Sequence, residues 1–293
     1  MALNESTKKN LRRKSGYIDS VQIYDNRPLF SWLEINVTEL CNRTCIFCPR
    51  QDPSFYPNQN LHLPLSLANK ISDELGGLNY EGAVVLCGYG EPLLHPTFSS
   101  IVETISKNSR VEIVTNGDHL TSKNINKLIS LGASYFVVSM YDGPEQVDKF
   151  QNMFLAAGCD ESYFILRDRW HSEKDAFGLK LTNRAGTVEI GDQDPIDDSH
   201  PCHYPAYSMT IDWNGDVLLC VQDWNKRVKL GNLNFQTLLE VWLSSELAKW
   251  RKRLMEGRRS KPPCNKCNAD GTLHGYNHVA VWKNKFFNKK IAS

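Results

Sequence analysis

The sequence has no long apolar run and no excess of charge of either sign. Its 34 Lys and Arg against 33 Asp and Glu give a formal net charge of +1, so there is no global attraction to nucleic acid or to a membrane surface. No apolar run approaches the roughly 20 residues that span a bilayer, and the polar amino terminus has no signal-peptide core. These absences predict a cytoplasmic protein that binds neither nucleic acid nor membrane.

The composition also lacks the features of a small secreted protein. The 293 residues are 41% hydrophobic and 23% charged, which is ordinary for a globular protein with a sizeable core. This length accommodates one large α/β domain and a smaller appendage. Nine cysteines without a secretion signal indicate reduced thiols that bind metal.

Three of the cysteines lie within eight residues and have no fourth cysteine nearby. Cys41, Cys45 and Cys48 follow the apolar run of residues 32–37 with the spacing C-x3-C-x2-C. Thiolates select iron–sulfur clusters or zinc, and a structural zinc site normally requires four ligands. Three thiolates can hold three irons of a four-iron cluster and leave the fourth iron open. The alternative, a buried group of cysteines without metal, is disfavoured because cysteine is too rare for three to be grouped by chance.

Short apolar runs alternate with helical patterns in the first two thirds of the chain. The runs cover residues 32–37, 83–86, 111–114, 135–138 and 163–166, and the helical patterns cover residues 66–75, 97–106, 122–130 and 145–155. This alternation predicts a parallel sheet covered by helices, of the α/β class. In such sheets the functional side chains gather at the carboxyl ends of the strands.

Glycine or polar residues follow every one of the predicted strands. The second strand leads into Gly88-Tyr89-Gly90-Glu91-Pro92, a segment that in isolation is typical of a plain turn. Its place one βα unit after the cysteine triad makes it a candidate site instead. The residues that follow the later strands are Thr115, Asn116, Gly117, Ser139 and Arg167.

The triad and the segment after the second strand resemble the radical S-adenosylmethionine (SAM) superfamily. An aromatic residue commonly precedes the third cysteine in that family, as Phe47 does here, and Gly90-Glu91-Pro92 is similar to its GGEP motif. Tyr89 stands where the family usually has glycine. The resemblance implies a partial (β/α)6 barrel, similar to a TIM barrel, in which the open iron chelates the amino and carboxylate groups of SAM.

The resemblance also implies the chemistry and the cofactor contacts. The reduced cluster would cleave SAM to methionine and a 5′-deoxyadenosyl radical. Glu91 and the backbone around it would bind the SAM amino group, residues 115–117 would approach the ribose, and Ser139 would contact ribose or carboxylate. The cofactor-binding residues expected on this basis are Gly88, Gly90, Glu91, Pro92, Thr115, Asn116, Gly117 and Ser139.

Four further cysteines follow a polar linker: Cys202, Cys220, Cys264 and Cys267. Residues 207–212 and 216–220 alternate around Asn214-Gly215, which predicts a β-hairpin between the first two of these cysteines. A single helix is expected over residues 238–254 because its apolar residues recur at helical spacing. Four thiolates that include a C-x2-C pair suit zinc.

The second unit resembles the twitch domain, the half-length form of the SPASM domain. In that family the four cysteines hold an auxiliary [4Fe-4S] cluster, so the resemblance favours a second cluster over zinc. No cysteine follows Cys267, as in the shorter form. Asn183-Arg184-Ala185-Gly186 is similar to a sequence of radical SAM enzymes with a cysteine-rich C-terminal domain; the alternative is a simple polar turn.

The predicted organisation has four parts: a polar arm at residues 1–30, the partial barrel at 31–190, the twitch domain at 191–270 and a basic tail at 271–293. The arm is expected to be solvated or partly disordered, with docking of a partner as the alternative. The tail is expected to be solvated, with a strap over the barrel or a partner contact as the alternatives.

The resemblance implies an oxidoreductase that removes hydrogen from a small polar metabolite such as a cyclitol or a sugar derivative. Loss of a hydrogen atom, an electron and a proton is a two-electron oxidation. The auxiliary cluster would accept the electron, and an external donor of the flavodoxin or ferredoxin type would reduce the first cluster. The candidates for the proton acceptor are Arg167, Arg169, Tyr89 and His171, although arginine is a poor base and is expected to orient the substrate.

Two other functions are considered. A radical SAM enzyme that cross-links or epimerises a peptide often carries an added leader-binding domain, for which the arm of residues 1–30 is too short. A non-enzymatic iron–sulfur electron-transfer protein would need none of the SAM-site residues. An epimerase would also need a thiol donor, and Cys87 is expected near the mouth of the barrel while Cys159 is expected at its opposite end.

Overall fold

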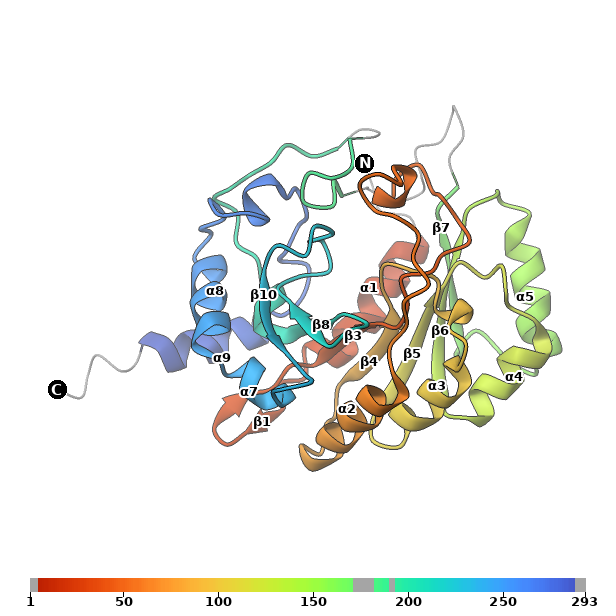
Figure 1. Cartoon of the computed structure of the whole chain (residues 1–293), viewed down its shortest axis with the longest axis horizontal. Helices are drawn as coiled ribbons and strands as arrows, with labels where there is room; N and C mark the ends of the chain where they lie inside the picture. Colours follow the sequence, from red (N-terminus) through yellow and green to blue (C-terminus); the bar gives the residue numbers. More distant parts are fainter. Residues whose placement is uncertain (1–4, 171–181, 190–192, 288–293) are drawn as a thin grey trace.

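A computed structural model describes residues 5–170, 182–189 and 193–287. Within these residues the main feature is an eight-stranded sheet with the order β10-β9-β8-β3-β4-β5-β6-β7, which curves around a central space (Figure 1). The barrel strands are parallel and comprise β3 (Trp32–Asn36), β4 (Ala83–Cys87), β5 (Arg110–Thr115), β6 (Ala133–Met140) and β7 (Phe164–Asp168). The prediction of an α/β fold with a parallel sheet is confirmed.

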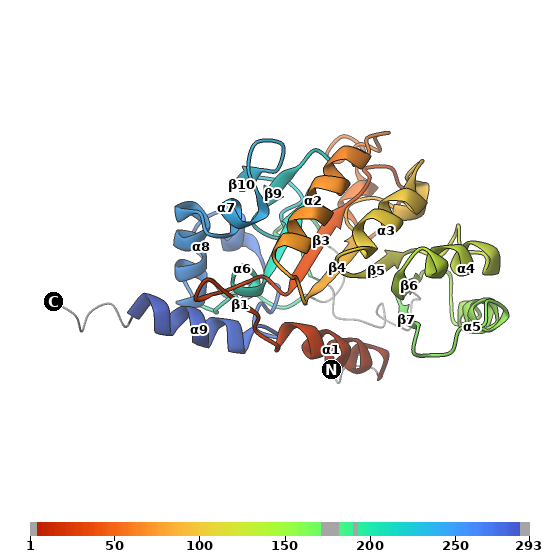
Figure 2. The same cartoon turned by 90° about the horizontal axis from the view of Figure 1, so that it is seen from below.

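Helices cover the outer face of these strands (Figures 1 and 2). They are α2 (Leu65–Gly77), α3 (Phe98–Ser106), α4 (Ser122–Ser130) and α5 (Gln146–Ala156). Their amphipathic spacing places apolar residues against the sheet, as Ile125 and Leu128 of α4 show. Thr121 begins α4 with a capping box, because its side chain accepts from the Asn124 N–H while the Asn124 side chain bonds back.

The two faces of a barrel strand differ because successive side chains point to opposite sides. In β3, Leu33 and Ile35 belong to the main apolar core beneath the helices. Trp32 and Glu34 alternate with them and line the inner cavity of the barrel. The register places Glu34 beside Val85 of β4 and Val85 beside Glu112 of β5, so two strands carry a carboxylate into this inner layer.

The predicted hairpin joins the same sheet on the other side of β3. Strand β8 (Ser208–Ile211) follows the short helix α6 (Tyr204–Tyr207) and runs parallel to β3. Strands β9 (Asp216–Leu218) and β10 (Lys229–Asn232) then continue in antiparallel order. Gly215 makes the turn with a φ of +87°. The sixth parallel strand therefore comes from the second cysteine-bearing unit.

The prediction of a single helix over residues 238–254 is wrong, because the structure has two helices there. They are α7 (Leu238–Trp242) and α8 (Ser245–Met255). Ser244 lies between them with a ψ of 148°, and its side chain accepts a hydrogen bond from the Leu247 N–H. A serine at such a position starts a new helix, because its oxygen satisfies a free backbone donor.

The amino-terminal segment is not a solvated arm. Residues 5–18 form α1 (Glu5–Ile18), followed by the short strands β1 (Ile23–Tyr24) and β2 (Arg27–Pro28). Ile18 is fully buried with Trp32, Ala83 and Tyr207, and the Ser6 hydroxyl donates to the Leu166 carbonyl. Tertiary contacts thus stabilise a helix that the polar composition of this segment did not predict.

The carboxyl-terminal segment is also helical, as α9 (Tyr276–Phe287). The Trp282 ring is buried, lies 6.1 Å from the Trp242 ring and donates its indole N–H to the Ala206 carbonyl at 3.0 Å. Figure 2 shows α1 and α9 on the side of the sheet opposite α2 and α3. No helix in the described part of the chain has the length and apolar character needed to cross a membrane.

Candidate functional site

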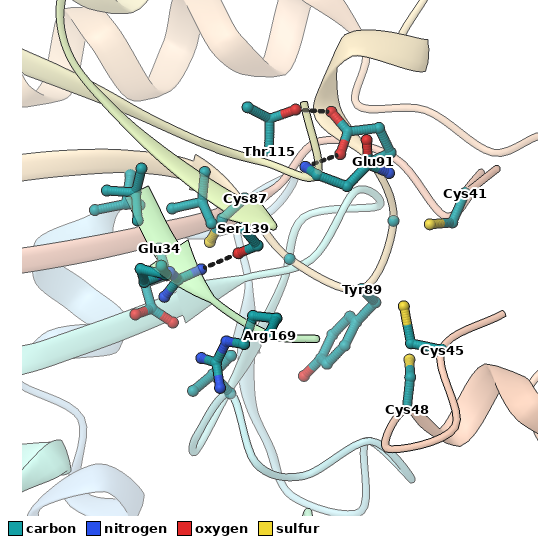
Figure 3. A pocket seen from close by; sticks show the side chains of 18 of the residues that line it. Glu34, Cys41, Cys45, Cys48, Cys87, Tyr89, Glu91, Thr115, Ser139 and Arg169 are labelled. Atoms are coloured by element: carbon teal, nitrogen blue, oxygen red, sulfur yellow. Dashed lines mark hydrogen bonds between the residues drawn. The ribbon is translucent and has the colours of Figure 1, made fainter. Parts of the chain in front are cut away.

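A cavity of about 390 Å³ begins at the carboxyl ends of the barrel strands and extends into the barrel (Figure 3). Its wall brings together most of the predicted site residues, namely Cys41, Cys45, Cys48, Gly88, Tyr89, Gly90, Glu91, Thr115, Asn116, Ser139, Arg167 and Arg169. Pro92 is buried beside this wall and begins the short helix η2 (Pro92–Leu94). His171 lies outside the described residues.

The three triad cysteines lie on one loop after β3, with their sulfur atoms turned toward the cavity (Figure 3). The Cys48 N–H donates to the Cys45 carbonyl at 2.9 Å, and the turn η1 (Pro49–Gln51) begins at the next residue. The Asn58 side chain accepts from the Cys41 N–H and donates to the Cys41 carbonyl, each at 2.9 Å. These bonds fix both ends of the loop.

Arg43 lies inside the triad and ties its loop to the loops after β5 and β6. Its guanidinium donates to Asp118 at 2.5 and 2.6 Å and to Asp142 at 2.7 Å, and it lies over the Tyr141 ring. The bonds to Asp142 and Asp118 raise the pKa of Arg43. Phe47 stacks on the same Tyr141 ring at 5.9 Å, which accounts for the aromatic residue before the third cysteine.

The pKa values of the triad thiols are raised when no metal is bound. Burial, followed by the neighbouring Cys48 and Cys41, raises the pKa of Cys45 to about 12. Burial also raises the pKa of Cys41 and of Cys48. Three thiolates here need a compensating cation, and a coordinating metal deprotonates a thiol outright. The donor set therefore fits three irons of a cluster.

Close backbone packing explains the glycines after β4. Gly88 has a φ of +123°, and a Cβ there would collide with Asn36. A Cβ on Gly90 would collide with the Thr38 carbonyl. Gly88 has a positive φ, whereas Tyr89 does not. A side chain is therefore accommodated at Tyr89, where the family usually has glycine.

Glu91 joins the loops at the strand ends and is 2% exposed. Its carboxylate accepts from the Thr115 hydroxyl at 2.6 Å, from the Asn116 N–H at 2.8 Å and from the Leu93 N–H at 3.1 Å. Burial nevertheless raises the pKa of Glu91 to about 7. A buried carboxylate that faces a cavity is a suitable acceptor for an amino group.

The loop at residues 115–117 is held against the triad loop. The Asn116 side-chain amide donates to the Asn42 side chain at 2.8 Å. Gly117 has a φ of +78°, and its N–H donates to the Thr115 hydroxyl at 3.0 Å. The turn thus presents its backbone beside Glu91, where a cofactor bound at the triad would extend.

Ser139 and Arg169 lie across the cavity from the triad in Figure 3, and Arg167 lines the same cavity. Arg167 pairs with Ser139 in the β6–β7 register and donates to its hydroxyl at 2.8 Å. Burial lowers the pKa of Arg167, and burial with the neighbouring Arg167 lowers the pKa of Arg169 to about 9. Tyr89 packs its ring 4.6 Å from Trp224. These side chains can orient a polar substrate.

The four later cysteines surround a second, small cavity: Cys202, Cys220, Cys264 and Cys267. Cys220 follows β9, Cys264 is the first residue of the turn η3 (Cys264–Lys266), and Cys267 directly follows that turn. The backbone N–H groups of Gln222 and Ala269 donate to the sulfurs of Cys220 and Cys267, each at 3.4 Å. Such bonds to sulfur tune the potentials of iron–sulfur clusters.

The chemistry of these thiols indicates a metal site. Burial raises the pKa of Cys202 to about 11 and of Cys264 to about 12, so a metal is needed for deprotonation. A single zinc would draw its four sulfurs to about 3.8 Å from one another. Within the described ranges, no three His, Cys, Asp or Glu side chains are placed to hold one metal ion. The donor types alone suit either zinc or an iron–sulfur cluster.

Two further cavity residues, Glu34 and Lys14, were not anticipated from the sequence, and a third, Arg184, belongs to the motif noted at residues 183–186. The signal for Glu34 is a charged residue on the inner face of an apolar strand. Lys14 reaches the cavity from α1, whose packing the sequence pattern does not reveal. Arg184 has a φ of +49°, and strained non-glycine residues of this kind cluster at functional sites.

A buried ionic network joins the triad loop to the C-terminal unit. Arg50 donates to the Tyr89 carbonyl at 2.5 Å and to the Glu39 carboxylate at 3.1 Å. Lys226 forms ion pairs of 2.6 Å with Glu39 and with Asp212. The network spans both cysteine-bearing units and fixes one against the other.

Comparison with known proteins identifies both units. The Radical SAM superfamily model matches residues 35–154, and the model of SPASM, an iron-sulfur cluster-binding domain, matches residues 202–268. The chain is 30% identical over 245 residues to the S-adenosyl-L-methionine-dependent 2-deoxy-scyllo-inosamine dehydrogenase of Niallia circulans, an alignment that covers 82% of this chain and 93% of the relative.

Solved structures support the same assignment. The crystal structure of BtrN in complex with AdoMet and 2-DOIA is similar, with a TM-score of 0.71, 27% identity and coverage of 86% of this chain and 98% of BtrN. SuiB of Streptococcus suis bound to the precursor peptide SuiA has a TM-score of 0.50 at 14% identity, with coverage of 95% and 76%, and this likeness shows the fold alone. The chain belongs to the radical SAM superfamily, among the enzymes that carry a SPASM-type iron–sulfur domain.

Proposed function

We propose that this radical SAM enzyme dehydrogenates a small polar metabolite such as a cyclitol or a sugar derivative. The observation that carries the proposal is that the two cysteine-lined cavities share a wall, because Tyr204 and Gln222 line both. A substrate in the first cavity would lie close to a second cluster that can accept its electron. The name of the similar Niallia circulans dehydrogenase, which gives 2-deoxy-scyllo-inosamine as its substrate, supports this choice.

The strand-end residues bind and orient the cofactor in this proposal. When bound, SAM and a cluster on Cys41, Cys45 and Cys48 supply the radical chemistry that removes hydrogen from an unactivated carbon. Glu91 accepts a hydrogen bond from the amino group, and the backbone of residues 115–117 lies along the ribose. Ser139 contacts the ribose or the carboxylate, as expected from its place at the end of β6.

The inner part of the cavity receives the substrate. Arg167, Arg169 and Tyr89 orient its hydroxyl groups, because each of them lines the cavity. Oxidation of a carbinol also requires that a hydroxyl proton be taken up. Glu34 is better suited to accept that proton than either arginine, since arginine remains protonated over the working pH range.

We also propose two [4Fe-4S] clusters per chain. Four thiolates around the second cavity leave no open coordination position, so that site is suited to electron transfer and not to substrate binding. An external donor of the flavodoxin or ferredoxin type would supply the electron that reduces the first site. The C-terminal unit, at residues 191–270, would then serve as the electron acceptor for the barrel at residues 31–190.

Modification of a peptide is the second candidate, since SuiB shares the fold and its structure holds a precursor peptide. The cavity favours a small substrate instead. It measures about 390 Å³, and its lining includes Asn10, Arg13 and Lys14 of α1, which take up the inner end of the barrel.

The proposal is tested with anaerobically reconstituted protein, SAM and dithionite. The wild type should form 5′-deoxyadenosine, and Cys45→Ala should abolish it. With cyclitols and sugars as candidate substrates, a two-electron oxidised product should accumulate in step with 5′-deoxyadenosine. A product in the same oxidation state as its substrate would contradict dehydrogenation while leaving SAM cleavage intact.

A further inference from the structure

Two residues of the C-terminal unit form the wall that separates the two cysteine-lined cavities. Tyr204 and Gln222 each line both cavities. Tyr204 follows Cys202 by two residues along the chain, and Gln222 follows Cys220 by two residues. Each of these side chains therefore starts close to a thiol of the second set.

The backbone of each residue contacts the preceding cysteine. The Gln222 N–H donates to the Cys220 sulfur at 3.4 Å. Burial is the largest effect on the pKa of Cys202 and raises it to about 11, whereas a hydrogen bond from the Tyr204 backbone opposes this rise. Both residues are thus held directly at the sulfurs that would ligate the second cluster.

The Tyr204 side chain extends from this wall into the barrel. Its ring packs with the inner-layer residues Trp32 and Val85 and lies 5.8 Å from the Tyr207 ring. Its hydroxyl forms no hydrogen bond with any described residue, yet it is not enclosed by protein atoms. Burial, followed by the neighbouring Cys220, raises the pKa of Tyr204. The hydroxyl therefore stays protonated and is free to donate.

Gln222 offers a second free donor at the same wall. The residue is 8% exposed, and its amide oxygen accepts from the Thr182 hydroxyl at 2.9 Å. The amide nitrogen forms no hydrogen bond with any described residue and is also not enclosed. Thr182 lines the first cavity as well. The hydrogen bond from Thr182 thus fixes the amide group in the wall and leaves its N–H groups available.

These donors lie on a different wall from the expected SAM contacts. Glu91 and residues 115–117 follow β4 and β5, which lie on one side of β3 in the sheet. Tyr204 precedes β8 and Gln222 follows β9, and both of these strands lie on the other side of β3. The amino group and the ribose of SAM therefore have partners of their own, and a second molecule in the cavity would meet Tyr204 and Gln222.

We propose that the Tyr204 hydroxyl and the Gln222 amide donate to one substrate oxygen, that of the hydroxyl group whose carbon is oxidised. This inference rests on the proposed function and specifies how its substrate is placed. Two donors on one oxygen hold the carbinol carbon at the wall behind which the second cluster lies. They also stabilise the negative charge that this oxygen acquires as its proton leaves.

The test uses Tyr204→Phe and Gln222→Met in the reconstituted full chain, with 2-deoxy-scyllo-inosamine, scyllo-inositol and D-glucose as candidate substrates. Each variant should raise the KM of the compound that is oxidised by about three- to tenfold, as expected for the loss of one neutral hydrogen bond. The ratio of oxidised product to 5′-deoxyadenosine should also fall, because the substrate is held less closely to the electron acceptor. The dissociation constant of SAM should stay within about twofold of the wild-type value.

Tyr207→Phe is the matched control for Tyr204→Phe. Tyr207 lies on the same short helix but does not line either cavity, so this variant should keep the wild-type KM and product ratio. Thr182→Val removes the hydroxyl that orients Gln222 and should raise KM less than Gln222→Met does. Iron content and the reduction potential of the second cluster, followed by electron paramagnetic resonance, should match the wild type in every variant.

An unchanged KM in either Tyr204→Phe or Gln222→Met would overturn the inference, because both donors are required. Weaker SAM binding would assign the donors to the cofactor, and an altered potential of the second cluster would assign them to its sulfurs. Either result would contradict a contact with substrate. If the wild type oxidises none of the three compounds, the proposed function fails and this inference fails with it. Oxidation with an unchanged KM counts against the donor pair alone.

Discussion

Glu91 illustrates how burial and hydrogen bonding oppose each other at a single residue. Three protein donors stabilise its charged form, yet burial is the larger effect and raises its pKa to about 7. At neutral pH the carboxyl group is therefore divided between two states. A bound amino group would favour the ionised state, because it supplies a partner for the charge.

We expect the affinity for SAM to rise with pH between about 6 and about 8, as Glu91 loses its proton. The SAM amino group titrates in a similar range, so Glu91→Gln, which never ionises, is the control. That variant should bind SAM about 10- to 100-fold more weakly at pH 8 and show a flatter pH profile. The measurement is the SAM dissociation constant across this pH range.

An identical pH profile in Glu91→Gln would remove Glu91 from the SAM site. Thr115→Val offers a second check on the same contact. It deletes one hydrogen bond to the carboxylate and keeps the side-chain shape, so its effect on affinity should be smaller than that of Glu91→Gln.

The two remaining cysteines test the oxidation chemistry. Cys87 lines the cavity at the end of β4, and burial raises the pKa of its thiol. Cys159 belongs to the outer apolar core, after α5. A redox-neutral inversion needs a hydrogen-atom donor such as a thiol, whereas an oxidation passes its electron to the second cluster.

We therefore expect Cys87→Ala and Cys159→Ala to retain product formation, with at most a modest loss from packing. The measurement is the ratio of product to 5′-deoxyadenosine. If Cys87→Ala continues to cleave SAM but loses product, the dehydrogenase proposal is wrong and an epimerase gains support. Cys159→Ala is the control for a general effect of removing a thiol.

At the scale of elements, the sequence predicts the barrel well and its additions poorly. The predicted strand at residues 83–86 corresponds to β4 (Ala83–Cys87), because buried parallel strands are short apolar runs bounded by turn residues. The signal for α1 was absent because its residues are mostly polar and only Ile18 is buried. The break before α8 depends on one serine cap inside an otherwise helical pattern.

The same distinction applies to the site. Strand ends and cysteine spacings follow from local sequence, so the triad and Glu91 could be located in advance. Lys14 and the Lys226 network depend on contacts between segments far apart in the chain. Such contacts leave no periodic pattern that the sequence alone would show.

Lys226 offers a test of the link between the two cysteine-bearing units. It pairs with the buried carboxylates of Glu39 and Asp212, so Lys226→Met leaves negative charge without its partner. We expect a loss of about 3–5 kcal/mol in the free energy of unfolding. Chemical denaturation followed by tryptophan fluorescence measures this loss.

The matched control is Lys229→Met, a few residues along the chain. Lys229 pairs with Asp216 at 2.7 Å but is half exposed, and Asp216 keeps its bonds to Asn214 and Asn232. Its loss should cost less than about 1 kcal/mol. Equal effects of the two variants would show that the buried network does not hold the units together.

At the scale of the whole molecule, the two cysteine-bearing units contribute strands to one continuous sheet. The hairpin strand β8 pairs directly with β3, and the triad loop follows the carboxyl end of that strand. The second cavity lies beside the first and shares Tyr204 and Gln222 with it. The order of the strands thus brings the two cysteine sets close to each other.

This arrangement predicts two clusters with separable roles. Reconstituted protein should bind about eight irons per chain, and replacing either cysteine set with alanine should leave about four. Loss of Cys41, Cys45 and Cys48 should abolish SAM cleavage. Loss of Cys202, Cys220, Cys264 and Cys267 should preserve 5′-deoxyadenosine formation but prevent the oxidised product, because the electron has no acceptor. About four irons in the intact protein, or stoichiometric zinc, would contradict two clusters, and full oxidation without the second set would contradict its proposed role.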